Sequence, residues 1–144
     1  MLALERDRYL KRANYRLIEE EIRCYQETKK MLEELRDDVI EGTSKVDGPR
    51  AEGQAGDPTG NKAIKLTAIA ISEAGRRVAA IEKALEQTGR AADPRRLQSI
   101  EMKFFQGYYT DQGIANRLGV ADSTVRRWRR DFVCLVAEKL GWPV

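Results

Sequence analysis

Residues 110–133 read TDQGIANRLGVADSTVRRWRRDFV, and this stretch decides the fold of the C-terminal part of the chain. Its apolar residues recur at helical spacing on both sides of Gly119, which predicts two short helices. Glycine takes a positive φ without steric cost, as a sharp turn between two helices requires. Ala115 precedes this glycine by four positions, and Val125 and Trp128 follow it by six and nine. The spacing predicts a helix-turn-helix.

The second of these helices has a basic face opposite Val125 and Trp128. If those two residues are buried, the face that carries arginines and small polar residues is exposed. Such a face suits the major groove of DNA, because arginine can bind a guanine edge through two hydrogen bonds or pair with a phosphate. The residues predicted to bind double-stranded DNA are Asp122, Ser123, Thr124, Arg126, Arg127, Arg129 and Arg130.

Two features of this stretch leave alternatives open. A basic helix can also be the solvated face of an ordinary helical protein, but the turn spacing together with the arginines favours DNA binding. Ala121 stands where such motifs usually have a Ser or Thr cap. Asp122 or Ser123 can cap the recognition helix instead, so its first residue is open by one position. Which of Asp122, Ser123 and Thr124 points at bases is open for the same reason.

The positive charge of the chain is concentrated near this motif. Of the 144 residues, 26 are Lys or Arg and 23 are Asp or Glu, so the net charge is +3. Residues 94–144 contain nine Lys or Arg against five Asp or Glu, whereas residues 1–41 contain nine against eleven. A basic surplus at the predicted recognition helix is the distribution expected of a DNA-binding chain.

Composition excludes several kinds of catalytic and metal site. The chain has no histidine, which excludes histidine-based acid–base catalysis and histidine-containing metal sites. Cys24 and Cys134 lie far apart without metal-ligand spacing, and we expect both to be reduced and half-buried. Adjacent carboxylates such as Asp37 and Asp38 diverge on a helix and make a poor acid–base pair. We expect no enzymatic activity, no cofactor and no metal ion.

The chain is predicted to be helical throughout, in four parts. Residues 1–41 contain no Gly or Pro and are rich in Glu, Arg, Lys and Leu, which predicts one long helix. Residues 42–61 contain five of the eleven glycines and two of the four prolines, which predicts a flexible linker. Residues 62–92 are predicted to form a second long helix, and residues 93–144 a helix-turn-helix domain. The expected fold is all-α, with a long helical hairpin or coiled coil and a C-terminal bundle.

Apolar and small residues in the second long helix recur with a period of seven. They are Ile64, Ile71, Val78 and Leu85, with Thr67, Ala74 and Ile81 three positions after the first three. This is a heptad seam, the pattern by which one helix pairs with another. Its partner is either the first long helix or the same helix of a second chain, and the two are not exclusive. We expect a homo-oligomer, with a dimer favoured.

The order of these parts resembles a known family. Residues 19–35 read EEEIRCYQETKKMLEEL, residues 57–66 read DPTGNKAIKL, and V-x-x-I-E-K-A-L begins at Val78. With the helix-turn-helix and the ending VAEKLGW, this arrangement resembles phage-encoded transcriptional regulators of the RinA/ArpU type, whose C-terminal part is like region 4 of sigma-70 factors. The resemblance covers nearly the whole chain.

The resemblance implies a regulator that binds upstream of late phage operons and promotes their transcription. Arg126, Arg127 and Arg130 would then make the contacts of the recognition helix, and RNA polymerase is a candidate partner. No segment has the apolar length that crosses a membrane, and MLALERDRYLKR at the N-terminus lacks the core of a signal peptide. We expect a cytoplasmic location in a bacterial host cell.

Two other functions remain in view. A terminase small subunit also joins a DNA-recognition motif to oligomerising helices, although its motif is N-terminal or central, whereas here it is C-terminal. A helical adaptor without DNA binding would use the heptad seam for a partner coil, and alanine at Arg126 and Arg127 would leave its function intact.

Overall fold

The computed structural model describes residues 3–42, 58–107 and 109–144, and within these residues every regular element is a helix. The expected all-α fold is therefore confirmed. The helices are α1 (Ala3–Arg23), α2 (Tyr25–Glu41), α3 (Pro58–Ile71), α4 (Glu73–Gly89), α5 (Pro94–Phe104), α6 (Asp111–Leu118) and α7 (Asp122–Leu140). The greater part of the predicted linker lies outside the described residues, and α3 begins within it, at Pro58.

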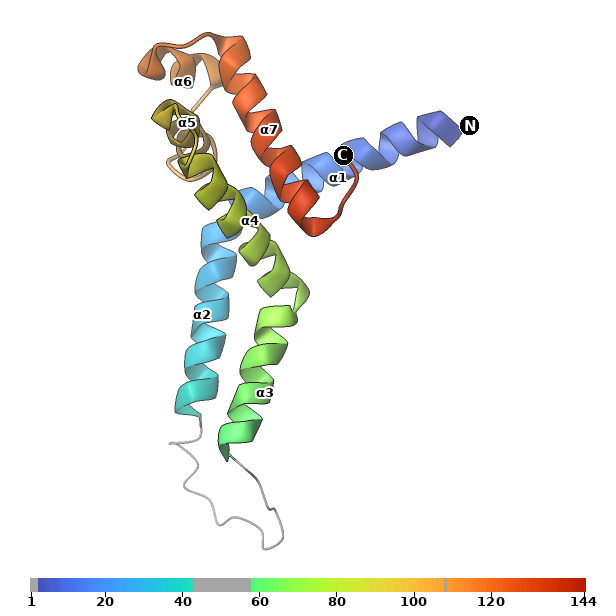
Figure 1. The fold of residues 1–144 in the computed structure, drawn as a ribbon, viewed down its shortest axis with the longest axis vertical. Coiled ribbons are helices and arrows are strands. Elements are labelled where there is room, and N and C mark those ends of the chain that lie inside the picture. The colour runs from blue at the N-terminus through green and yellow to red at the C-terminus, as the bar shows by residue number, and fades with distance from the viewer. Residues whose placement is uncertain (1–2, 43–57, 108) are drawn as a thin grey trace, which may run out of the picture.

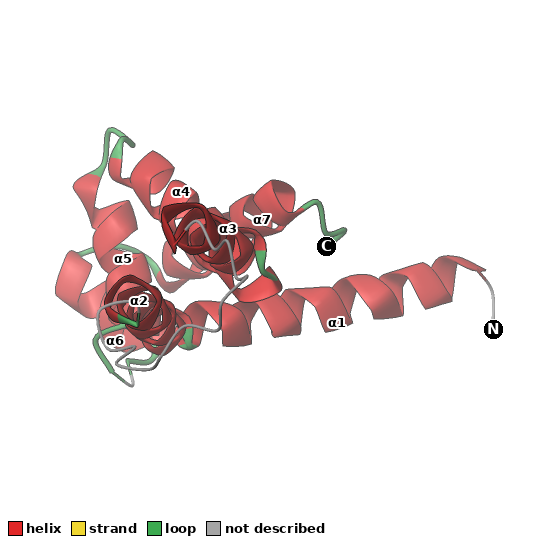
Figure 2. Cartoon of the chain, turned by 90° about the horizontal axis from the view of Figure 1, so that it is seen from below, coloured by secondary structure: helices red, strands yellow, loops and turns green. Residues whose placement is uncertain are grey.

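The molecule is elongated, with a helical hairpin at one end and the helix-turn-helix at the other (Figure 1). Helices α2 and α3 run side by side as the hairpin, and α4 continues from α3 into the bundle of α5, α6 and α7. Helix α1 crosses the C-terminal half of α7, and its N-terminal half projects from the body (Figures 1 and 2). The two predicted long segments thus pair within one chain.

The single helix expected over residues 1–41 is instead two helices that meet at Cys24. This residue has φ −84° and ψ 0°, outside ideal helical geometry. The reason is tertiary, since the two halves pack in different directions: α1 packs against α7, and α2 packs against α3 and α4. Tyr25 begins the new direction, with its ring 5.7 Å from that of Phe105.

The second expected long helix is also divided, at Ser72. The Ser72 hydroxyl accepts a hydrogen bond from the backbone N–H of Gly75 at 3.1 Å, which is a helix cap and starts α4. At Gly75 an added Cβ would lie 2.4 Å from the carbonyl oxygen of Ile69, so the turn requires glycine there. A serine followed three positions later by glycine is the signal that marks this boundary.

The break at Ser72 divides the heptad seam. On α4, Val78 and Ile81 are buried in the core. On α3, Ile64 and Ile71 remain 69% and 61% exposed. The sequence pattern predicts that the seam runs along one continuous helix. In the structure its α4 half is buried and its α3 half is exposed.

One hydrophobic core joins the helices of the crossing region. It includes Ile18 and Ile22 of α1, Ile81 of α4, and Phe132 and Val136 of α7. Because this cluster spans residues on both sides of position 93, the domain boundary predicted there does not separate two cores. The division of the chain into functional domains at residue 93 stays a prediction.

Candidate nucleic-acid interface

Helices α6 and α7 form the predicted helix-turn-helix. Thr110 caps α6, where its hydroxyl accepts a hydrogen bond from the N–H of Gly113 at 3.0 Å. Gly119 ends the helix in the left-handed region, at φ 68° and ψ 39°, and its N–H donates to the carbonyl of Ala115. The N–H of Val120 donates to the same carbonyl at 3.0 Å. Glycine is required here because the turn needs a positive φ.

A small second core holds the motif together. Ile114 and Ala115 of α6 pack against Val125 of α7 and Met102 of the supporting helix α5, and all four are buried. The exposed fraction of Trp128 is 7%, so its role is packing. The spacing argument is confirmed, because the small residue, the turn glycine and the two apolar residues lie where a helix-turn-helix requires them.

The recognition helix begins at Asp122, with Ala121 as its N-cap. Ala121 has an extended backbone, φ −76° and ψ 151°, and no side chain caps the helix. The expectation that Asp122 or Ser123 would be the cap is therefore wrong. Asp122 is the first helical residue and half-buried, and its negative charge is favourable at the positive end of the helix dipole. Thr124 is also half-buried, whereas Ser123 is exposed.

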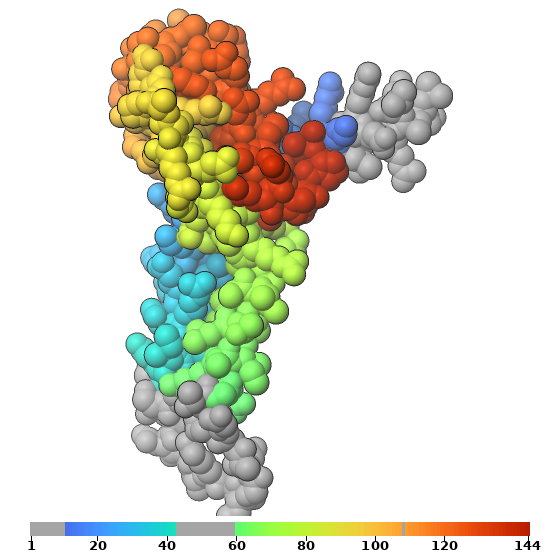
Figure 3. Space-filling model, in the orientation of Figure 1, coloured from blue at the N-terminus to red at the C-terminus, as the bar shows by residue number. Residues whose placement is uncertain are grey.

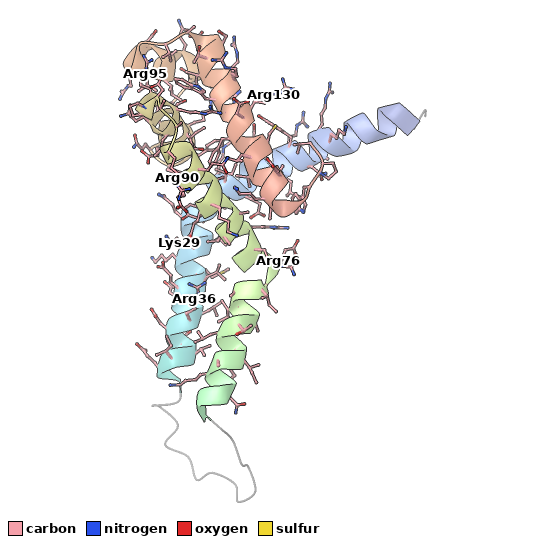
Figure 4. All side chains as sticks on the ribbon, viewed as in Figure 1. Lys29, Arg36, Arg76, Arg90, Arg95 and Arg130 are labelled. Atoms are coloured by element: carbon pink, nitrogen blue, oxygen red, sulfur yellow. The ribbon has the colours of Figure 1, made fainter. Side chains whose placement is uncertain are left out.

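Three of the predicted arginines share one exposed face with Ser123. Arg126, Arg127 and Arg130 follow Ser123 by three, four and seven positions, which places them on one side of α7. All three are exposed, and none forms an ion pair within the described part of the chain. In Figure 4, Arg130 projects from α7 on the side towards which α1 extends.

The other basic side chains near the motif mostly have carboxylate partners. Arg95 pairs with Asp93 at 2.9 Å. The hydrogen bonds from Arg95 stabilise the charged carboxylate and so lower the pKa of Asp93. Arg96 of α5 pairs with Asp131 of α7 at 3.1 Å. Most of the unpaired positive charge of residues 94–144 is thereby left on the exposed face of α7.

Arg129, also predicted to bind DNA, is held inside the motif. Its Nη1 lies 2.7 Å from Oδ1 of Asp111, and Lys103 Nζ lies 3.1 Å from the same oxygen. The Arg129 and Asp111 side chains are each 22% exposed. The structure thus places Arg129 on a different side of α7 from Arg126, Arg127 and Arg130.

The charges around Asp111 determine its ionisation. Burial opposes the charged form, but the hydrogen bond from Lys103 and the positive charges of Arg129 and Lys103 outweigh it, so the pKa of Asp111 is lowered. Tyr15 of α1 lies beside the same arginine, and burial together with Glu19 raises the pKa of its hydroxyl, against the effect of Arg129. One carboxylate therefore ties α5, α6 and α7 together, and Tyr15 of α1 lies beside the arginine that it binds.

One exposed cation was missed in the sequence analysis. The guanidinium of Arg117 on α6 lies 4.6 Å from the ring centroid of Tyr109, and its Nη1 donates to the Tyr109 hydroxyl at 3.2 Å. Its sequence signal is weak, because a single basic residue in the last turn of a helix is common. The adjacent Tyr108 lies outside the described residues.

Two further searches cover the described residues only. They contain no group of three or more acidic or cysteine side chains placed to hold a metal ion. None of their helices combines the length and the apolar character needed to span a membrane.

The fold and this site define a helical protein of the helix-turn-helix class. The sequence model of the ECF sigma factor family matches residues 15–132, which is most of the chain. The chain belongs to this family, whose members act on DNA together with RNA polymerase. Comparison with curated proteins and with solved structures finds no match.

Proposed function

We propose that this protein recognises a specific DNA sequence with the exposed face of α7 and regulates transcription from that site as a phage late-gene activator. The observation that carries the proposal is the set of three arginines, Arg126, Arg127 and Arg130, that keep their charge unpaired on one exposed helical face. Arg129 of the same helix and Arg95 and Arg96 of α5 are paired with carboxylates, so this face carries most of the unpaired arginine charge of residues 94–144.

Each side chain of the face has a proposed role. Ser123, Arg126 and Arg127 lie in the first two turns of α7 and read base edges, since the N-terminal part of a recognition helix enters the major groove. A good two-hydrogen-bond contact to a base contributes about 1–3 kcal/mol of discrimination. Arg130 lies one turn further and binds a phosphate, which supplies affinity without sequence preference. Arg129 acts as a positioning residue through Asp111.

RNA polymerase is the proposed protein partner, and the bacterial cytoplasm the proposed place of action. Membership of the ECF sigma factor family supports a polymerase contact in general. The phage late-gene role rests on the resemblance of the whole arrangement to RinA/ArpU regulators. If the protein is an activator, it should raise transcription from its target site in a reaction with purified host polymerase.

The first test is selection of fragments of the source genome by the purified protein at about 150 mM salt, which suppresses purely electrostatic binding. The proposal predicts one upstream region, recovered by the natural protein and lost with Arg126→Ala plus Arg127→Ala. Recovery of the packaging genes' own coding region would favour a terminase small subunit. Uniform or absent recovery would contradict sequence recognition and leave a helical adaptor.

A second test asks whether bases are read in the major groove. Guanines of the selected site are replaced one at a time by 7-deazaguanine, which removes the N7 acceptor from that groove alone. At contacted guanines this replacement should weaken binding by the natural protein. It should not further weaken binding by the variant that lacks Arg126 and Arg127. Equal losses in both proteins would contradict readout by these two arginines.

We further propose that the exposed half of the heptad seam joins two copies of the chain. The groove along α3 is lined by Ala63, Ile64, Thr67, Ala68 and Ile71, and nearly all of its surface is apolar. Ile69 on the same helix packs against the core, so α3 has apolar side chains on two sides. The spacing of Ile64, Thr67 and Ile71 is that of helix pairing, and a two-fold dimer presents the same seam from both chains.

Light scattering after gel filtration tests the dimer. Ile71→Glu places a charge in the seam and should give a monomer, while Leu17→Glu, at a side chain 45% exposed on α1, should leave the dimer intact. A natural protein that is monomeric at about 100 µM, well above typical working concentrations, contradicts the proposal. So does a dimer that survives Ile71→Glu.

A further inference from the structure

Helix α1 carries a second set of basic side chains without carboxylate partners. Lys11, Arg12 and Arg16 are exposed, and within the described residues none of them forms an ion pair. The family match begins at residue 15, so Lys11 and Arg12 lie outside it. These charges need an explanation of their own.

The acidic residues in the last two turns of α1 have contacts elsewhere. Glu20 pairs with Arg23 at 2.9 Å, and Glu21 pairs with Arg77 of α4 at 2.6 Å. Glu19 is half-buried beside Tyr15. Arg12 and Arg16 therefore have no carboxylate partner among the side chains that the structure describes.

The contacts of α1 fix the direction in which this side faces. Asn14 Nδ2 donates to the carbonyl of Pro143 at 2.9 Å, just beyond the C-terminal end of α7. Arg12 and Arg16 are each two residues from Asn14, which turns them about 200° around the helix axis. They therefore lie on the opposite side of α1, the side that faces the helix-turn-helix end of α7.

The same contacts place α1 against α7 within about one helical turn of Arg130. Tyr15 lies next to Arg129 and Cys134 of α7, and Cys134 follows Arg130 by one helical turn, about 6 Å along the axis. Figure 3 shows the described side chains of α1, in blue, rising beside α7, in orange and red. In Figure 4, Arg130 projects into the angle between the two helices.

We propose that Arg12 and Arg16 bind phosphates of the DNA duplex whose major groove holds α7, on the flank next to the C-terminal half of that helix. The inference rests on the proposed function of α7. Phosphates border the major groove on both sides, and arginines that reach one border raise affinity without reading sequence. Helix α1 thereby acts as a second DNA contact, which widens the site beyond the bases that α7 reads.

The test compares two double variants of the full chain on a fluorescent duplex with the selected site and long flanks. Arg12→Ala plus Arg16→Ala removes the proposed contacts. Arg36→Ala plus Arg76→Ala is the matched control, because both arginines are exposed, both lack an ion pair within the described residues, and both lie on other helices (Figure 4). The two variants have the same net charge, and circular dichroism should show both folded like the natural protein.

Affinity is measured by fluorescence anisotropy across a range of salt. Two lost phosphate contacts should lower affinity about tenfold at about 150 mM salt and reduce the salt slope by about 2, because each contact contributes about 0.9 to that slope. The control should change affinity by less than about twofold. On a short duplex trimmed to the recognised bases, the natural protein and the Arg12/Arg16 variant should bind alike.

The outcomes separate this inference from the proposed function. If both double variants bind the long duplex equally, the contact by α1 is contradicted, while loss of binding with Arg126→Ala plus Arg127→Ala still supports the role of α7. If the Arg12/Arg16 variant is weaker on the short duplex by the same factor, the contact is not on the flank and the inference fails. If the Arg126/Arg127 variant keeps full affinity, the proposed function itself fails.

Discussion

The two sides of α7 carry the same kind of side chain in different surroundings. The run RRWRR contains Arg126, Arg127, Arg129 and Arg130. On one side, Arg129 is 22% exposed and bound to a carboxylate that Lys103 shares. On the other, the remaining three are exposed and have no acidic partner within the described residues.

This difference teaches how to separate structural charge from functional charge in a basic motif. A partly buried cation is retained only with a partner, because an unpaired buried charge is costly. A surface cation needs none, and for the several that gather on one face of α7 we propose that the partner is DNA. The proposed interface is therefore drawn from the charge that remains after internal pairing, and not from the total charge.

The largest effect should come from Arg126→Ala plus Arg127→Ala. Loss of two base contacts should weaken binding to the selected site about 100-fold or more, since each contributes about 1–3 kcal/mol. The free energy of unfolding should stay within about 0.5 kcal/mol of the natural value, because both side chains are exposed. Anisotropy and urea unfolding on the same samples check this. A comparable loss of stability would contradict the assignment.

Asp111→Asn tests the side of α7 that carries Arg129, because it removes the carboxylate to which Arg129 is bound. It leaves Lys103 and Arg129 close together without their shared counter-charge, and should lower the free energy of unfolding by about 2 kcal/mol. The matched control is Glu86→Gln, which removes an ion pair with Arg90 between side chains that are 64% and 75% exposed. Exposed pairs contribute little, so thermal unfolding should show a clear decrease for Asp111→Asn only. Equal decreases in the unfolding temperature of the two variants would contradict the structural role of Asp111.

Arg130 offers a smaller test, of phosphate binding against base reading. Arg130→Ala should weaken binding about tenfold and lower the salt slope by about 1, whereas Arg130→Lys should restore most of the affinity, because lysine also binds phosphate. Arg126→Lys should not restore the affinity lost in Arg126→Ala, because lysine lacks the planar fork. Equal rescue at both positions would contradict the division of roles.

The smallest effect is the acid dependence of stability. The pKa of Asp111 is lowered in the folded protein, so its contribution is complete above the pKa of an unfolded aspartate, about 3.9. It is lost as pH falls through the lower folded value. Urea unfolding between pH 7 and about pH 3 should therefore bring the natural protein and Asp111→Asn closer together in acid. A gap that stays constant would contradict the lowered pKa.

The sequence predicted the motif well because its signals are local. Ala115, Gly119, Val125 and Trp128 each have a role that depends on neighbours a few positions away. Such positions can be identified from spacing alone.

The features that were missed depend on distant parts of the chain. The break at Cys24 has no Gly or Pro to announce it, and follows from the packing of α1 and α2 in different directions. The pairing of Arg129 joins residues 18 positions apart across the turn, so the run RRWRR alone could not separate it from its neighbours. The approach of α1 to α7 joins opposite ends of the sequence. These are tertiary facts, and a periodicity does not contain them.

The most direct test of the account is an alanine scan of the four arginines of RRWRR, with DNA affinity and unfolding free energy measured for each variant. The account predicts that Arg126→Ala, Arg127→Ala and Arg130→Ala lose affinity at unchanged stability. Arg129→Ala should lose stability while its folded fraction keeps most of its affinity. If Arg129→Ala instead behaves like the other three, the two sides of α7 do not differ in function and the account is wrong.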